Sequence, residues 1–300
     1  MQLWTEAMRA GRYHEAWDME AAAIAARDPA SRDDPALPYH RRWVWDGRPV
    51  DGRDVLVRCY HGLGDTIQFA RYLPVLAGRA ASVMLEVQPR LAPLLAGIGV
   101  DRIIPFDVRS PTPPSECTLE ITELPGALRV SPEELGAPYL SWAPADLPPG
   151  TIGLCHAAGD WDALRSIPAE LFRPLCEQHP CVTLVPGETT LLCLNPGGCP
   201  LDMEATAALV AAADLVVTVD TMIAHLAGAM GKPTCLLLRA DPDWRWAPDR
   251  RDSAWYPTIR LYVQSTPGDW SAVLAAVLAD LPLPSPARFS HPRSHAAWPA

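Results

Sequence analysis

Three stretches of the chain combine glycines, carboxylates, hydroxyls and an arginine in patterns suited to binding a phosphate-activated group. The first is Gly62-Leu-Gly64-Asp65-Thr66. Glycines let the backbone approach a ligand, and a following helix directs free N–H groups and a partial positive charge at the turn. The stretch matches neither the dinucleotide fingerprint nor the P-loop. Asp65 therefore has two interpretations: it is an N-cap of the helix, or it acts on a ligand.

The second stretch is Val217-Thr-Val-Asp220-Thr221-Met222-Ile-Ala-His225. An apolar strand is expected to end at Asp220, and a helix is expected to carry His225. Asp220 and Thr221 can cap this helix. Alternatively, the Thr221 hydroxyl and the free amides of Thr221 and Met222 hold a diphosphate, while Asp220 hydrogen-bonds hydroxyls of the ligand. His225 lies about one turn into the helix, so it either reaches the same cleft or is a structural histidine.

The third stretch, Gly159 to Pro168, contains Arg165 and Ser166 after an expected strand and before an expected helix. An arginine here can neutralise a phosphate bound at the opposite helix terminus, or it can be a solvated surface residue. Together the three stretches indicate a cleft with anion-binding helix ends, one arginine and two carboxylates that follow strands. Such a cleft suits transfer of a group from a phosphate-activated donor.

Composition and the missing motifs exclude several other classes of protein. The formal net charge of −10 over 300 residues argues against a nucleic-acid partner. The eight cysteines include no CxxC pair, and no HExxH or Gly-x-Ser-x-Gly motif occurs, so neither a metal nor a cofactor is expected. A nicotinamide-dependent dehydrogenase is disfavoured because its fingerprint is absent. No apolar run approaches the length of a membrane span and the N-terminus lacks a signal-peptide pattern, which predicts a cytoplasmic protein.

The elements that must position these stretches alternate between short apolar strands and helices. Strands are expected at 55–59, 83–87, 102–104, 119–121, 152–155, 182–185, 215–219, 234–238 and 259–263. Helices are expected at 66–73, 90–96, 169–178, 203–213, 223–230 and 271–281. This alternation predicts an α/β protein with parallel sheets covered on both faces. Ligands of such sheets bind beyond the carboxyl ends of the strands, where the three stretches lie.

The strand–helix pattern restarts after a Pro-rich linker, which divides the chain. We expect a helical segment and connector at 1–45, one Rossmann-like domain at 46–148, a second at 149–281, and a disordered Pro-rich tail at 282–300. The first segment is expected to be helical to Ala26. It resembles the second half of one tetratricopeptide repeat through Gly11-Arg-Tyr13-His-Glu-Ala16. Because no second copy follows, it is expected to dock on its own domain.

Several motifs, in a fixed order, resemble a known family. They are Gly62-Leu-Gly-Asp65, Arg165-Ser-Ile-Pro168, Asp220-Thr-Met-Ile-Ala-His225, Pro242-Asp-Trp-Arg-Trp246 and Trp255-Tyr-Pro257. The chain resembles the glycosyltransferase domain that follows many bacterial tetratricopeptide-repeat arrays, which is related to the ADP-heptose:lipopolysaccharide heptosyltransferases of glycosyltransferase family 9. The resemblance covers about residues 40–280. It implies a GT-B architecture, in which two Rossmann-like domains face a cleft.

The resemblance also implies an inverting, metal-independent transfer of a sugar from a nucleotide-sugar donor to the hydroxyl of a protein, glycan or small-molecule acceptor. Asp65 would be the general base. The donor and its diphosphate would be held by Arg165, Ser166, Asp220, Thr221, Met222 and His225. The acceptor loop would comprise His61, Gly62, Gly64 and Gln68.

Some residues depart from the family pattern. His61 stands where a Gln is usual, and Ala163 replaces one arginine of the family pattern. Val185 lies at the end of a strand whose sequence differs from that pattern, and Arg239 stands where a Pro is common. Losing a cation from a diphosphate site weakens donor binding. An alternative interpretation is therefore a catalytically degenerate GT-B-like protein that binds a nucleotide, a sugar or a partner.

Overall fold

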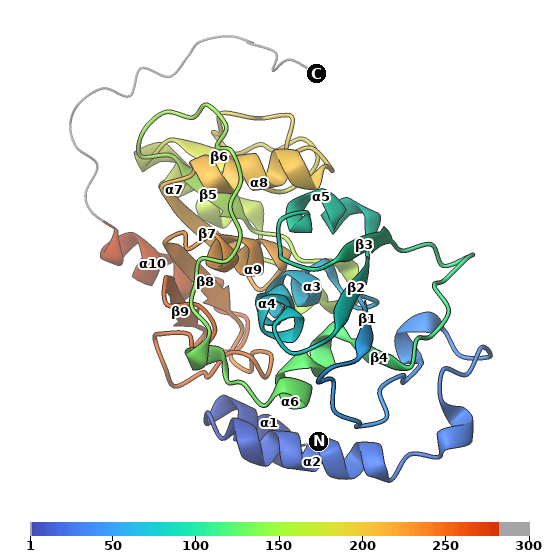
Figure 1. Cartoon of the computed structure of the whole chain (residues 1–300). Coiled ribbons are helices and arrows are strands. Elements are labelled where there is room, and N and C mark those ends of the chain that lie inside the picture. The colour runs from blue at the N-terminus through green and yellow to red at the C-terminus, as the bar shows by residue number, and fades with distance from the viewer. Residues whose placement is uncertain (1, 282–300) are drawn as a thin grey trace.

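Short apolar runs form two separate parallel sheets in the structure, which is a computed structural model describing residues 2–281 (Figure 1). The central strands are almost wholly buried, as expected for parallel sheets covered by helices on both faces, whereas the edge strand β3 is partly exposed. The first sheet has the order β3-β2-β1-β4, and the second has the order β6-β5-β7-β8-β9. The strands of the first sheet are β1 (Asp54–Arg58), β2 (Ser82–Val87), β3 (Arg102–Pro105) and β4 (Cys117–Glu120). Those of the second are β5 (Ile152–Cys155), β6 (Cys181–Thr183), β7 (Leu215–Val219), β8 (Thr234–Leu238) and β9 (Ile259–Val263).

Each sheet contains one point where the strand order reverses direction. In the first sheet this point lies between β1 and β4, where Arg58 pairs in register with Glu120. In the second it lies between β5 and β7, where Cys155 pairs with Thr218. Ligands of open α/β sheets bind in the crevice beyond the carboxyl ends of the strands at such a point. The segments that follow β1, β4, β5 and β7 are therefore the ones expected to carry a site.

Helices cover the sheets and connect their strands (Figure 1). Four of them carry proline in their first turn, where the missing N–H has no intrahelical partner to lose. The helices are α1 (Gln2–Arg9), α2 (Tyr13–Ala25), α3 (Leu63–Phe69), α4 (Leu73–Ala77), α5 (Ala92–Leu95), α6 (Leu124–Leu128), α7 (Arg173–Gln178), α8 (Met203–Ala212), α9 (Met222–Ala229) and α10 (Trp270–Asp280).

The N-terminal helices α1 and α2 pack against both sheet-containing halves. They form a hairpin that lies along the lower edge of the molecule in Figure 1 and is joined at Gly11, whose φ of +71° ends the first helix. The segment is helical to Ala25, close to the expected end, but it consists of two helices. Trp4 packs edge-on against Trp244 of the C-terminal half, and Arg129 of the N-terminal half pairs with Asp18 at 2.8 Å. The segment was predicted to dock on its own domain, and it packs against both halves of its own chain.

The two halves meet where helix α3 packs against helix α9. A Cβ on Gly64 would lie 2.9 Å from Cδ2 of His225, and a Cβ on Gly228 would lie 2.4 Å from the ring of Tyr256. Both distances are shorter than side-chain packing allows, so the absence of a side chain at each glycine permits the close approach. One continuous hydrophobic cluster contains residues from α1, α2, the first sheet and the inner face of the second. The halves are thus joined by core packing beneath the site.

Most expected elements are present, with shifts at their ends. The strands expected at 152–155, 215–219, 234–238 and 259–263 have the predicted bounds. The helix expected at 66–73 instead begins at Leu63 and is interrupted after Phe69 by a 3₁₀ turn. Helix α6 was not predicted, because the Pro-rich composition of its segment indicated a loop. The proline lies in the first turn of the helix, where it is tolerated. The expected tail at 282–300 lies outside the described residues, and the proposed domain bounds stay predictions.

Candidate functional site

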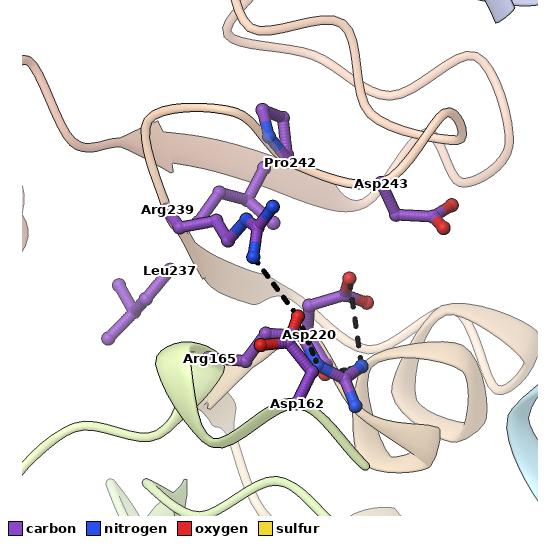
Figure 2. Close-up of a pocket in the computed structure, with 8 residues that line it drawn as sticks. Asp162, Arg165, Asp220, Leu237, Arg239, Pro242 and Asp243 are labelled. Carbon is purple, nitrogen blue, oxygen red and sulfur yellow. Dashed lines mark hydrogen bonds and ion pairs between the residues drawn. The ribbon is translucent and has the colours of Figure 1, made fainter. Parts of the chain in front are cut away.

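A first cavity of about 160 Å³ lies beyond the carboxyl ends of β5, β7 and β8 (Figure 2). Its floor is formed by Arg165 and Asp220, which follow β5 and β7. The Nη1 atom of Arg165 donates a hydrogen bond to the backbone oxygen of Asp220 at 2.7 Å and lies 3.9 Å from Oδ2 of the same residue. The structure therefore brings together two residues that the sequence predicted to share a site.

A second arginine lines this cavity from the opposite side. Arg239 follows strand β8, and its Nη1 lies 3.2 Å from Oδ2 of Asp162. Figure 2 shows its guanidinium group directed toward the cavity floor. Arg239 and Arg165 both lie near Asp162, and Arg165 Nε is 3.7 Å from the same Oδ2. Two guanidinium groups thus face one small space, an arrangement suited to a doubly charged phosphate group.

Asp220 is a largely buried carboxyl with perturbed acidity. Burial, together with the neighbouring Asp243 carboxylate, raises the pKa of Asp220 to about 6, although Arg165 and Arg245 partly offset both effects. Because the charged form is disfavoured, the carboxyl takes up a proton not far below neutral pH. A carboxyl in this state both donates and accepts hydrogen bonds, which suits contact with sugar hydroxyls.

Ser166, Thr221 and Met222 were also predicted to bind the donor. They follow Arg165 and Asp220 directly in the sequence but make other contacts. The Ser166 hydroxyl accepts a hydrogen bond from the backbone N–H of Ala158 at 3.0 Å, which fixes the loop after β5. Thr221 is the N-cap of α9 in extended conformation, and its side chain makes no capping hydrogen bond. Met222 is the first helical residue and is half-buried. The N-terminus of α9 is therefore formed as the sequence predicted.

His225 is placed differently from the other residues of its stretch. Its imidazole is buried between α9 and Gly64 of α3, and its Nδ1 lies 3.0 Å from the hydroxyl of Tyr256. Burial holds the pKa of His225 well below its usual value, and the nearby cations Arg245, Arg71 and Arg165 contribute in the same direction. The ring is consequently neutral at physiological pH and supplies no positive charge to a ligand.

Asp65 lies at the start of α3, directly after the glycine turn. The predicted N-cap position was wrong, because Gly62 is the N-cap and Asp65 is the third helical residue; its Oδ2 accepts a hydrogen bond from the backbone N–H of Gly62 at 3.0 Å and so stabilises the start of the helix. Its Oδ1 receives a 2.5 Å bond from Nη2 of Arg245, which comes from the C-terminal half. A carboxylate has about four lone-pair positions, so these two bonds leave it able to accept another hydrogen. Stabilising the start of the helix and acting on a ligand are therefore compatible roles for Asp65.

Arg245 is the residue that connects the two halves at the site. Its Nε donates to Oε1 of Gln68 at 2.5 Å, and its Nη1 lies 2.8 Å from Oδ1 of Asp243. Its guanidinium also lies over the ring of Trp244 at 4.3 Å. Because Asp243 lines the first cavity while Arg245 lines a second one, the segment around them forms the wall between the two cavities.

The second cavity, of about 450 Å³, lies on the side of Asp65 that faces helices α1 and α2. The imidazole of His61 hydrogen-bonds the carboxylate of Glu120, which raises the pKa of His61. Burial raises the pKa of Glu123 to about 8, with Glu120 and Glu20 contributing in the same direction. The cavity therefore brings together titratable groups from the turn after β1, the end of β4 and the N-terminal helices.

Sequence reasoning identifies the residues after β1, β5 and β7 but misses those from the loop after β8. In the sequence, Arg239 stands out only as a departure from the family pattern, and Arg245 only as part of a Trp-Arg-Trp string. A basic residue directly after an apolar strand was the available signal for Arg239. For Arg245 the local sequence contains no comparable signal, because its partner Asp65 lies 180 residues away.

Residues 2–281 contain neither a metal cluster nor a membrane span. No group of three or more His, Cys, Asp and Glu side chains in this range is arranged to hold a metal ion. In the same range, no helix combines the length and apolarity needed to cross a membrane.

Part of the chain matches a known family, and the chain is similar to one curated protein. Residues 196–254 match the model for glycosyltransferase family 9 (heptosyltransferase). Protein FlbA of Caulobacter vibrioides is 25% identical over an alignment covering 90% of this chain and 52% of that protein. The chain thus spans about half the length of this curated relative.

Solved structures share the fold at low sequence identity. A family 9 glycosyltransferase from Veillonella parvula has a TM-score of 0.54 and 12% identity, covering 78% of this chain and 91% of that one. The heptosyltransferase WaaC of E. coli, solved with ADP-2-deoxy-2-fluoro heptose, has a TM-score of 0.50 and 14% identity, covering 75% and 99%. TibC from enterotoxigenic E. coli, described as an iron-containing dodecameric glycosyltransferase, has a TM-score of 0.52 and 12% identity, covering 76% and 67%.

These findings confirm the predicted relationship to the heptosyltransferases and the α/β fold with two parallel sheets of the GT-B kind. The relationship of the N-terminal helices to tetratricopeptide repeats stays a prediction.

The raised pKa of Asp220 predicts how stability depends on pH. Folding raises this pKa from 3.8 to about 6, so the folded state binds the proton more tightly than the unfolded state does. The stabilisation from the protonated form is complete below about pH 4 and is lost as pH rises through about 6. Asp220→Asn should therefore exceed the wild type in free energy of unfolding by about 2–3 kcal/mol above pH 6, and by almost nothing near pH 4. Urea unfolding of both proteins at a series of pH values measures this difference, and a difference independent of pH would contradict it.

Proposed function

We propose that this chain, a relative of the glycosyltransferase family 9 heptosyltransferases, transfers a sugar from a nucleotide-sugar donor to an acceptor hydroxyl with inversion at the anomeric carbon. The observation that carries the proposal is the arrangement around Arg245. A carboxylate on one side of it faces a large cavity, and two arginines with a protonatable carboxyl face a smaller cavity on the other. This arrangement provides one side for the acceptor and one for the diphosphate of the donor.

In the proposed reaction, the acceptor oxygen attacks the anomeric carbon from the face opposite the diphosphate. The bond between that carbon and the phosphate oxygen breaks, and the nucleoside diphosphate leaves with the bonding electron pair. The acceptor proton passes to the carboxylate of Asp65 as the new bond forms. The backbone N–H of Gly62 and the guanidinium of Arg245 orient this carboxylate, so that it acts from a fixed position.

Arg165 and Arg239 are proposed to stabilise the charge that develops on the leaving diphosphate. The chain has Ala163 where the family pattern has an arginine, and Arg239 restores the cation from the opposite side of the cavity. The cavity of about 160 Å³ is below the usual range of about 300–1,000 Å³ for ligand sites. We therefore assign it to the diphosphate, with Thr221 and Met222 contributing the N-terminus of α9 and Ser166 fixing the neighbouring loop. Asp220 is proposed to contact sugar hydroxyls.

One observation favours the alternative function, a protein of this fold that binds nucleotide or sugar without transfer. Both oxygens of Asp65 already accept hydrogen bonds, one from Gly62 and one from Arg245. A carboxylate held in a close ion pair is a poorer base if Arg245 remains in place when the acceptor binds. Turnover distinguishes the two functions, because a binding protein retains affinity for the nucleotide and transfers nothing.

Replacing Asp65 tests its role as the base. Asp65→Asn should lower the rate constant of sugar transfer about 10²- to 10⁴-fold. The affinity for a nucleoside diphosphate should stay within about twofold, because Asp65 does not line the donor-side cavity. Transfer is measured against a panel of nucleotide-sugars and nucleotide affinity by calorimetry, with Asp249→Asn at an exposed position as the control. Equal turnover by Asp65→Asn and the wild type would remove Asp65 from the mechanism, and nucleotide binding without any turnover by the wild type would favour the alternative function.

Replacing Arg239 tests the assignment of the diphosphate. Arg239→Gln removes one charge-assisted contact and should raise the dissociation constant of a nucleoside diphosphate about tenfold, while leaving that of the unphosphorylated nucleoside unchanged. The matched control is Arg109→Gln, whose side chain is 87% exposed and pairs only locally with Asp107. Calorimetric titrations with both ligands provide the measurement. An equal loss for nucleoside and nucleoside diphosphate would show that Arg239 contacts something other than phosphate.

A further inference from the structure

The cavity on the Asp65 side is unusual in the number of indole rings that surround it. Helices α1 and α2, the connector before β1 and the loop after β8 all contribute to its wall, together with the turn after β1. Its volume of about 450 Å³ lies within the usual range for small-ligand sites. Five tryptophans line it: Trp4, Trp17, Trp45, Trp244 and Trp255.

Three of these indoles keep part of their surface exposed at the cavity. Trp4, Trp45 and Trp244 are half-buried, whereas Trp17 and Trp255 are buried beneath them. Trp4 stands edge-on to Trp244 with the ring centroids 5.0 Å apart, so the two rings form a corner. An indole face carries partial negative charge. It therefore packs well against a ring whose face presents C–H groups with partial positive charge, as the face of a sugar ring does.

Carboxyl groups lie between these rings. The carboxylate of Glu20 accepts a hydrogen bond from Nε1 of Trp4 at 2.8 Å, and that of Glu120 is hydrogen-bonded to His61. Asp65 lies at the end of the cavity nearest the wall shared with the donor side. Carboxylates accept hydrogen bonds from hydroxyl and ammonium groups at the edge of a ring.

The charges of the cavity disfavour an anionic ligand. Four acidic side chains line it against two arginines, of which Arg245 pairs with Asp65 while Arg27 lies 3.8 Å from Glu123. Burial raises the pKa of Glu123 to about 8, and the carboxylates of Glu120 and Glu20 contribute in the same direction, so the space around this carboxyl disfavours a further negative charge. A phosphate or carboxylate on the ligand would add like charge to this space.

We propose that this cavity is the acceptor site, and that it takes a hydroxylated ring with one apolar face, such as a sugar, that is uncharged or carries an ammonium group. The inference rests on the proposed function, because the hydroxyl that reacts is the one placed at Asp65. In this proposal helices α1 and α2 contribute to the site, because Trp4, Trp17 and Glu20 line the same cavity as Asp65. It also separates this chain from any enzyme whose acceptor is held through phosphate or carboxylate groups.

Binding of matched glycosides tests the inference without requiring turnover. Methyl glycosides of a set of hexoses, of the corresponding 2-amino-2-deoxyhexoses and of the corresponding hexuronic acids are titrated against the full chain. Binding is followed by tryptophan fluorescence and by saturation-transfer NMR, and nucleoside diphosphate binding is measured by calorimetry on the same samples. For at least one ring configuration, the neutral and amino glycosides should bind at least tenfold more tightly than the uronic acid.

Two variants and one control locate the binding in this cavity. Trp4→Ala should weaken glycoside binding at least fivefold, while Leu3→Ala on the same helix, at a side chain that is 68% exposed and outside the cavity, should leave it unchanged. Glu20→Gln preserves the shape of the site and should reduce the advantage of the amino glycoside at least threefold. The thermal unfolding midpoint of each variant is recorded to check that it folds. If Trp4→Ala does not fold, the result for Glu20→Gln decides the test.

The outcomes separate this inference from the proposed function. Binding of the uronic acids as tightly as the neutral glycosides, or equal binding by all three variants, would overturn the acceptor class. Binding of no glycoside at millimolar concentration would overturn it too, and if the nucleoside diphosphate still binds, the donor side of the proposed function stands. Glycoside binding without nucleoside diphosphate binding supports the ligand class of the cavity and contradicts the transferase.

Discussion

The ion pair between Arg245 and Asp65 is the interaction on which the arrangement of the site depends. It joins a residue at the start of α3 to a residue in the loop after β8, and so it fixes the two halves relative to each other. The guanidinium is largely buried and also contacts Gln68 and Asp243. Removing one partner of such a buried pair leaves an uncompensated charge. The packing of Gly64 on α3 against His225 on α9 keeps the two helices close enough for the pair to form.

The chemistry on each side of Arg245 follows from the topology of the sheets. Each half reverses its strand order once. The segments after β1, β5 and β7 contain Asp65, Arg165 and Asp220, and Glu120 is the last residue of β4. The donor-side cavity combines two guanidinium groups with a carboxyl whose pKa is about 6. The other cavity combines indoles with carboxylates. In the proposed function, the guanidinium groups contact the diphosphate, and the indoles and carboxyl groups contact the acceptor.

The sequence predicted those parts of the fold that depend on local patterns. Apolar runs identified the strands, and the glycine turn indicated that a helix follows β1, although this helix begins at Leu63 and its N-cap is Gly62 and not Asp65. The burial of His225 was not predictable from its own stretch, because it depends on Gly64 in the other half. Arg245 and the indoles of α1 were missed for the same reason. Their partners are distant in the chain, and only the closure of the two halves brings them together.

The central claim is that a single displacement occurs between the two cavities, with Asp65 facing the acceptor and the arginines facing the leaving diphosphate. The most direct measurement is the anomeric configuration of the first-formed product, read from the H1–H2 coupling constant in a ¹H NMR time course with a nucleotide-sugar of known configuration. A product whose configuration is opposite to that of the donor is the result predicted. A product that retains the configuration of the donor would contradict the account, because it requires two displacements or attack from the same face as the diphosphate.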